Sequence, residues 1–221
     1  SIVLSCDTNT SLFSLDVWIW DEDGNGDYCT VQLLISENCE PVDSLTAGIS
    51  GLIFTETRKN LGGVEVTLNS GLPEYPRVMT TEIDGAYAFD TNPIGLNYSL
   101  NSFKNDDYIN GVSSLDLIFI RRHILAINTL DSPYKIIAAD ANNSQSVSAA
   151  DITLLQLLVL GKIDVLPQSD TWRFIEEDYE FFNEQNPWPF TETIDLIGLR
   201  REELDHNFIA VKVGDVNGNV D

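Results

Sequence analysis

Residues 140–151, DANNSQSVSAAD, carry side-chain oxygens at nearly every second position and end on an aspartate that opens an apolar run. A loop that wraps a calcium ion presents ligands at its positions 1, 3, 5, 7, 9 and 12, with the backbone carbonyl acting at position 7. The spacing therefore predicts a calcium loop followed by a helix, whose N-terminus a carboxylate also favours. The residues at the six positions are Asp140, Asn142, Ser144, Ser146, Ser148 and Asp151.

A second copy of this pattern lies earlier in the chain. Residues 111–127, GVSSLDLIFIRRHILAI, align with residues 146–162, SVSAADITLLQLLVLGK, so that Asp116 matches Asp151. Two copies are too few for a solenoid and instead predict a pair of loop-helix units that bury each other. By the same offset, the ligand positions of the first loop hold Asn105, Asp107, Ile109, Gly111, Ser113 and Asp116.

The first copy departs from the pattern at one position. Ile109 has no side-chain oxygen, so Asp106 or Asn110 would replace it if the loop is shifted. For both copies the alternative is a polar loop whose closing aspartate only caps a helix. That alternative accounts for Asp116 and Asp151 but not for the oxygens upstream of them.

The duplicated loop and helix, with Asp at position 12 and no clear entering helix, resembles dockerin, the calcium-binding module of cellulosomes. The resemblance covers residues 104–165 and implies calcium as the cofactor. In dockerins, residues just before the closing aspartate and on the following helix contact a protein partner. The second copy is apolar at these positions, which suits packing on a neighbouring domain, so the first copy is the better candidate for a partner surface. Its matching residues are Ser114, Leu115, Arg121 and Arg122.

Residues 12–36, LFSLDVWIWDEDGNGDYCTVQLLIS, hold two alternating apolar stretches around a Gly-rich turn. Such a pattern predicts a β-hairpin. The tryptophan strand, the turn and the cysteine that follows resemble the last two strands of the HYR-like immunoglobulin repeats of bacterial surface proteins. We therefore assign residues 1–44 to the C-terminal half of such a domain.

All three cysteines lie in the first forty residues. The register of the hairpin puts Cys39 at the same end as Cys6, whereas Cys29 lies near the turn, so we predict a Cys6–Cys39 disulfide with Cys6–Cys29 as the alternative. An odd count predicts a free thiol or a partner in sequence not included here. Disulfide formation favours an oxidising compartment.

Residues 45–103 contain four predicted strands, two of them in GISGLIFTETRKNLGGVEVTL and two in TTEIDGAYAFDTNPIGLNYSL. The pattern D-G-x-Y-x-F, followed by P-x-G-x-x-Y, resembles the carboxypeptidase-regulatory-like or Cna-B-like β-sandwich. This resemblance implies a spacer or stalk module without chemistry of its own. The residues that carry it are Asp84, Gly85, Tyr87, Phe89, Pro93, Gly95 and Tyr98.

Residues 166–221 mix aromatic and acidic side chains and end in the predicted strand NFIAVKV followed by GDVNGNVD. We predict an aromatic arm that packs on the other modules; stacking of Trp172, Tyr179 and Trp188 on sugars is the alternative. The oxygens at Asp215, Asn217, Asn219 and Asp221 begin a third calcium loop or belong to a solvated linker. The order of all these segments resembles a C-terminal block of large proteins that gliding-type bacteria secrete by the type IX route.

The composition limits the function. With 35 acidic against 12 basic residues the net charge is −23, so nucleic acid and anionic membranes are poor partners. No apolar run is long enough to span a membrane, and no HExxH, GxSxG or phosphate-binding glycine loop occurs. The start of the chain reads as a strand in mid-domain, which predicts a fragment of a longer protein.

These observations predict a multi-domain, mainly β chain with immunoglobulin-like and Cna-B-like sandwiches and a small α-helical dockerin-like EF-hand pair. The predicted function is that of a non-catalytic, calcium-stabilised structural or adhesive segment of a secreted protein at the bacterial cell surface. Its partners would be calcium ions and neighbouring domains of the same protein. The alternative is a dockerin-like module that docks a separate protein.

Overall fold

The computed structural model describes residues 12–20, 26–34 and 46–220, which belong to two compact units divided after residue 45. In the first unit, β1 (Leu12–Trp20) and β2 (Gly26–Leu34) form an antiparallel pair, the hairpin that the alternation predicts. Cys29 lies exposed on β2. Cys6 and Cys39 lie outside the described residues, so the disulfide stays a prediction.

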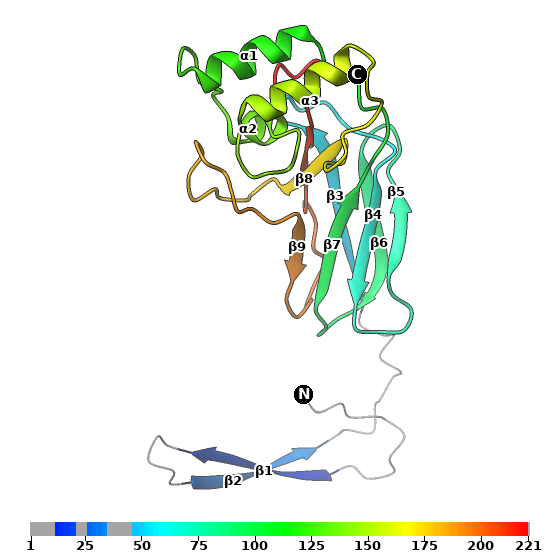
Figure 1. Ribbon diagram of the computed structural model, residues 1–221. Coiled ribbons are helices and arrows are strands. Elements are labelled where there is room, and N and C mark those ends of the chain that lie inside the picture. Colours follow the sequence, from blue (N-terminus) through cyan, green and yellow to red (C-terminus); the bar gives the residue numbers. More distant parts are fainter. Residues whose placement is uncertain (1–11, 21–25, 35–45, 221) are drawn as a thin grey trace. The chain divides into compact units, whose positions relative to one another are not determined.

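The second unit is a sandwich of two four-stranded sheets, with three helices gathered at one end (Figure 1). One sheet has the order β6-β3-β10-β8 and the other the order β5-β4-β7-β9. The strands are β3 (Thr46–Thr55), β4 (Glu65–Ser70), β5 (Arg77–Thr80), β6 (Ala86–Pro93), β7 (Tyr98–Phe103), β8 (Trp172–Glu176), β9 (Thr193–Leu196) and β10 (Phe208–Lys212), and the helices are α1 (Ser114–Ile124), α2 (Pro133–Ala139) and α3 (Ala149–Val159).

The predicted mainly β sandwich is thus present, but its boundaries differ from the prediction. Residues 45–103 supply five strands, and residues 166–221 supply the remaining three, β8, β9 and β10, instead of an arm. The last of these, β10, lies between β3 and β8, parallel to the first and antiparallel to the second. A strand buried on both faces reads as a continuous apolar run, and the first four residues of FIAVK, all buried, have this composition.

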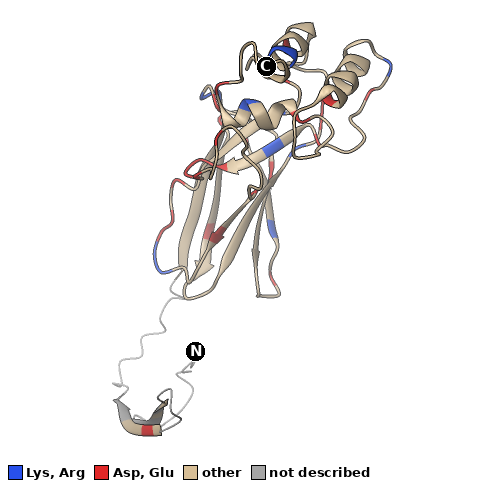
Figure 2. Ribbon diagram, turned by 60° about the vertical axis from the view of Figure 1, so that its left-hand side comes forward, with Lys and Arg blue, Asp and Glu red and all other residues tan. Residues whose placement is uncertain are grey.

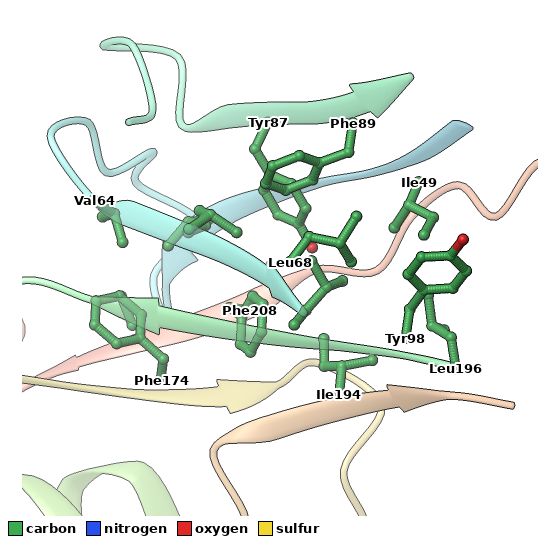
Figure 3. Packing of buried hydrophobic residues seen from close by; sticks show 14 of the residues in the cluster. Ile49, Val64, Leu68, Tyr87, Phe89, Tyr98, Phe174, Ile194, Leu196 and Phe208 are labelled. Carbon is green, nitrogen blue, oxygen red and sulfur yellow. The ribbon is translucent and has the colours of Figure 1, made fainter. Parts of the chain in front are cut away.

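Two cores meet at β10. Phe208 and Ala210 point between the sheets, where Figure 3 shows Phe208 among Leu68, Phe174 and Ile194. The alternate residues of β10, Ile209 and Val211, point to the other face, because successive side chains of a strand leave on opposite sides. That face is covered by the helices, through buried residues that include Ile120, Ile136 and Leu155.

The helical segment 104–165 is therefore not a separate domain, since its apolar residues share a core with the sheet. Contrary to the expectation of no entering helix, the short helix α2 precedes the loop at residues 140–151. Ser113 and Ser148 are the N-cap residues of α1 and α3, and each forms a capping box with the aspartate three residues on. No helix within the described residues is long and apolar enough to cross a membrane.

Candidate metal centres

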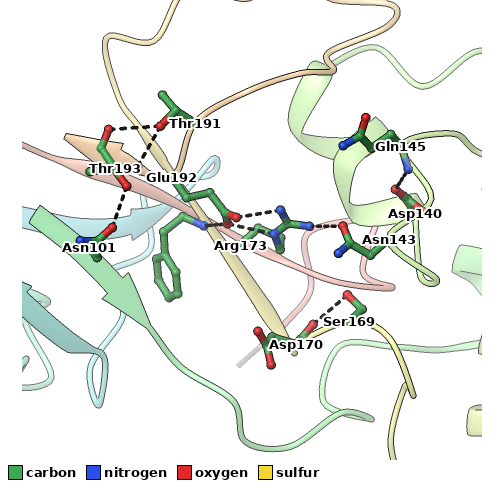
Figure 4. Close-up of polar contacts among 11 residues, drawn as sticks. Asn101, Asp140, Asn143, Gln145, Ser169, Asp170, Arg173, Thr191, Glu192 and Thr193 are labelled. Atoms are coloured by element: carbon green, nitrogen blue, oxygen red, sulfur yellow. Dashed lines mark hydrogen bonds and ion pairs between the residues drawn. The ribbon is translucent and has the colours of Figure 1, made fainter. Parts of the chain in front are cut away.

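The loop at residues 140–151 folds around two buried carboxylates, those of Asp140 and Asp151. The backbone N–H groups of Ser144 and Gln145 donate to Asp140 Oδ1 and Oδ2 at 2.9 and 2.7 Å, and Figure 4 shows the second of these bonds. Asn142 N–H donates to Asp151 Oδ1 at 3.2 Å. The first and last predicted ligands are thereby held by one curled segment.

The remaining predicted ligands lie within the same curl. The hydroxyl of Ser144 lies 3.1 Å from that of Ser146, and Asn142 Oδ1 accepts from Ser144 N–H at 3.1 Å. Ser148 donates its hydroxyl to Asp151 Oδ2 at 3.1 Å. The structure therefore brings together all six residues that the spacing selects in this loop. Gln145, at the position where such loops usually carry glycine, has a φ of 61°.

The first predicted loop is built differently. Asp116 is fully buried and accepts from Ser113 N–H and Oγ–H, as Asp151 does from Ser148. Asn105, however, turns to the start of β8, where it accepts from the N–H of Thr171 at 3.1 Å. Asp107 Oδ1 accepts from the N–H groups of residues 109 and 110 in its own turn. The two upstream residues chosen by the sequence offset are thus committed to other contacts, because the chain from β7 continues beside β8.

The C-terminal loop meets Asp116 instead. Val216 N–H and the Asn217 side-chain amide donate to Asp116 Oδ1 at 3.0 and 2.9 Å. Asp215 Oδ1 accepts from Asn219 N–H, and Asp215 Oδ2 accepts from Val220 N–H. These donors lie four and five residues after the aspartate, as Ser144 and Gln145 do after Asp140 in the continuous loop.

We call this arrangement the split loop. Residues 215–219 stand where the first half of a calcium loop would stand, and residues 111–116 supply the second half, although Val216 and Asp116 are 100 positions apart in the chain. The sequence contained a signal for it: D-x-N-x-N at residues 215–219 repeats the oxygen spacing of residues 140–144, whereas the first copy holds Ile109 where an oxygen ligand is needed. The residues that the split loop gathers are Gly111, Ser113, Asp116, Asp215, Asn217 and Asn219; Asp221 lies outside the described residues.

Electrostatics are unfavourable in both loops without a cation. Burial raises the pKa of Asp140, and the nearby charge of Asp151 raises it further. Burial likewise raises the pKa of Asp116, and Asp215 adds to that effect. Hydrogen bonds from the loop oppose these shifts without cancelling them, so each loop holds one aspartate whose charge is poorly solvated.

The donor set fits a hard cation. No group of three or more His, Cys, Asp or Glu side chains able to hold a metal gathers within residues 12–20, 26–34 and 46–220. Each loop offers two carboxylates, and amide, hydroxyl and carbonyl oxygens supply the rest. Calcium accepts such an all-oxygen set, and a low count of charged ligands is typical of its weaker sites.

A single arginine connects the continuous loop to the sandwich. Arg173 on β8 donates Nη1–H to Asn143 Oδ1 at 2.8 Å and pairs through Nε and Nη2 with both carboxylate oxygens of Glu192 (Figure 4). A bidentate pair fixes the plane of the guanidinium as well as its position. Arg173 therefore holds the loop against the sheet, and Glu192 fixes the position of Arg173.

The four residues predicted to contact a partner lie on α1. Ser114, Arg121 and Arg122 are exposed, and Leu115 is 48% exposed. His123, beside them, accepts from Leu130 N–H through Nδ1 at 3.1 Å. Among the aromatic residues considered for sugar stacking, Trp172 is buried in the sandwich core.

No protein-family model and no curated protein matches the chain. BcpA, the major pilin subunit of Bacillus cereus, is similar over 44% of this chain and 28% of its own, with 12% identity and a TM-score of 0.25. The C-terminal fragment of the pilus adhesin SpaC from Lactobacillus rhamnosus GG is similar over 45% of this chain and 38% of its own, with 13% identity and a TM-score of 0.26. Both similarities are too low to assign a function.

The close approach in the split loop predicts the effect of Gly111→Ala. Gly111 has a φ of 76°, and a Cβ there would lie 2.8 Å from Val220 Cβ and 2.9 Å from Asp215 Oδ2. Gly95→Ala is the matched control, because Gly95 has a similar φ of 83° but open space around it. We expect Gly111→Ala to lower the free energy of unfolding by about 1–3 kcal/mol more than the control. Equal losses in urea unfolding would contradict the packing of residues 215–220 on Gly111.

Proposed function

We propose that residues 46–221 are a calcium-stabilised, non-catalytic structural module of a protein at the bacterial cell surface, with a role as a stalk or adhesive spacer. The observation that carries this proposal is the position of β3 and β10. These strands pair in parallel, from Ile53 with Phe208 to Thr55 with Ala210. The chain enters β3 at the end of the sandwich away from the helices (Figure 1). Val220 lies against Gly111, just before α1.

Such an arrangement resists extension. Tension between the two ends of the unit would slide β3 along β10, so their hydrogen bonds and the apolar contacts of both cores would be loaded together instead of one after another. A stalk needs this property, whereas an enzyme needs a reactive site. The order of strands therefore supports a mechanical role.

Calcium would add a second restraint. An ion in the split loop would tie residues 215–219, which follow β10, to the start of α1. An ion in the continuous loop would tie the end of α2 to the start of α3. Extracellular calcium modules work with dissociation constants of about 10⁻⁴–10⁻³ M, and a ligand at about 100 times its dissociation constant stabilises a fold by about 2.7 kcal/mol. Two such ions would therefore strengthen the end of the module where the helices lie.

Calcium titration tests the assignment of ligands. We expect two calcium sites in the unaltered chain. Asp151→Ala and Asp215→Ala should each keep one calcium site, because each change removes a carboxylate that only one loop uses. Asp107→Ala is the control and should keep two sites, because Asp107 serves its own turn. Isothermal calorimetry gives the stoichiometry, and circular dichroism verifies the fold of each variant. Unchanged stoichiometry in Asp151→Ala, or loss of a site in Asp107→Ala, would refute the assignment.

Force spectroscopy tests the mechanical role. With handles at both ends of the chain, we expect residues 46–221 to extend in one main event, at a force that falls when calcium is chelated. In Asp215→Ala the difference made by calcium should be smaller, because only the continuous loop can respond. Separate extension of the helices and the sandwich at low force would contradict a stalk.

Docking of a separate protein is the second candidate function. It is favoured by one observation: α1 leaves Leu115 and Ile118 about half exposed, next to the exposed pair Arg121 and Arg122. An apolar patch beside two cations suits a partner with an apolar and acidic face. Figure 2 shows the basic positions of the unit in blue.

A charge reversal distinguishes docking from the stalk. If α1 docks a partner, Arg121→Glu with Arg122→Glu should abolish its capture from an extract of surface proteins. A second pair of adjacent exposed arginines, Arg200 and Arg201, provides the matched control, and their reversal should leave capture unchanged. Equal capture by both double variants would exclude docking through α1.

A further inference from the structure

A cavity of about 520 Å³ lies between the turn at residues 59–63, the segment that follows β7 and the start of β8. Its size falls in the range of small-molecule sites, about 300–1,000 Å³. Three of the five lysines of the chain line it, Lys59, Lys104 and Lys212, with only two acidic side chains, Asp106 and Glu82. On a chain of net charge −23 this is a local excess of positive charge.

Lys212 is the most unusual of these residues. It lies on β10, is only 4% exposed, and its ammonium stands 5.9 Å from the centre of the Trp172 ring. An ammonium carries three donors, and Nζ donates to Tyr108 O at 3.2 Å. Within the described part of the chain no carboxylate lies at ion-pair distance from it. A buried cation normally has a paired anion, so two of its N–H donors remain for a ligand in the cavity.

Lys104 is fixed next to the cavity by two contacts. Its Nζ pairs with Asp106 Oδ2 at 2.8 Å and donates to Gly63 O at 3.4 Å. Asp106 also accepts from the Trp172 indole N–H at 3.2 Å. Glycine at residue 63 is part of this arrangement, because a Cβ there would lie 3.0 Å from Lys104 Nζ. The contacts with Asp106 and Gly63 therefore fix the position of the Lys104 ammonium.

The rest of the lining mixes polar and apolar groups. Asn60 contributes an amide group, the backbone at Gly62 and Gly63 approaches without side chains, and Leu61 and Ile83 contribute apolar surface. The Thr81 hydroxyl is already bonded to Val64 N–H and to Leu61 O. Polar groups of this kind hydrogen-bond hydroxyls, while the ammonium groups select a negative charge. The lining therefore suits a small ligand that carries hydroxyl groups together with one carboxylate.

We propose that this cavity binds a carboxylate-bearing sugar of monosaccharide size, with the carboxylate on Lys212 and Lys104. The site uses none of the calcium-loop ligands, so it stands apart from the function proposed above. Because the negative net charge of the chain repels anions, the contact with Lys212 and Lys104 must provide the selectivity for a carboxylate.

Protein NMR tests the site with D-glucuronate as the probe and D-glucose and acetate as controls, both with calcium and without it. The Trp172 indole N–H, which bonds Asp106, is the reporter. We expect a saturable shift with glucuronate, and binding at least about tenfold weaker for glucose and for acetate, the size of one charge-assisted hydrogen bond. Equal affinity for glucose would overturn the role of charge. Equal affinity for acetate would leave an adventitious ion only and overturn the sugar site.

Lysine variants complete the test. Lys212→Met keeps the length of the side chain without its charge and should weaken glucuronate binding at least about tenfold. Lys162→Met, at an exposed lysine outside the cavity, is the control and should bind as the unaltered chain does. If Lys212→Met does not fold, Lys104→Met serves in its place and should show a similar loss. Retained affinity in a folded Lys212→Met or Lys104→Met would overturn the proposal.

Discussion

The second unit depends on the burial of β10 on both of its faces. Phe208 and Ala210 complete the core between the sheets, while Ile209 and Val211 form the floor on which the helices pack. Without this strand, β3 and β8 would have no common neighbour and the helices would have no apolar surface beneath them. The sandwich and the helical segment are therefore two sides of one structure.

Beyond β10, two buried carboxylates at helix starts determine the shape of the polar end. Asp116 and Asp151 each complete the capping box of a helix and also accept a hydrogen bond from a second segment, from Val216 N–H in one case and from Asn142 N–H in the other. The geometry is repeated, yet one second segment is adjacent in sequence and the other is far away. The same hydrogen bonds to a buried carboxylate are thus made by two different paths of the chain.

Much of this could be predicted from the sequence, because the signals concerned are local. The alternation of residues 12–36 predicted the hairpin, and the oxygen spacing predicted which residues of the continuous loop come together. The failures have a common physical origin. The offset between the two copies assigned Asn105 and Asp107 to the first loop on the assumption that a loop is continuous, and the β-sandwich was placed within residues 45–103 on the assumption that a sheet is completed by neighbouring strands.

Periodicity tests neither assumption. The apolar pattern of FIAVK indicates that the strand is buried, but it does not indicate which strands and helices bury it. The aromatic residues near Trp172 gave a similar ambiguity. Their composition suits an arm as well as an edge strand, and only the pairing of β8 with β10 decides between them. Long-range pairing of this kind is what local patterns leave undetermined.

The split loop and the central place of β10 also have a consequence for how the chain acquires its structure during synthesis. Residues 46–103 leave the ribosome early, but the strand that separates β3 from β8 and the segment that meets Asp116 are made more than a hundred residues later. Contacts between distant segments require the closure of long loops and slow folding. The unit therefore cannot finish folding before residues 208–220 have been made. Until residues 208–220 emerge, an apolar sheet edge remains open, a state in which chains readily pair with one another.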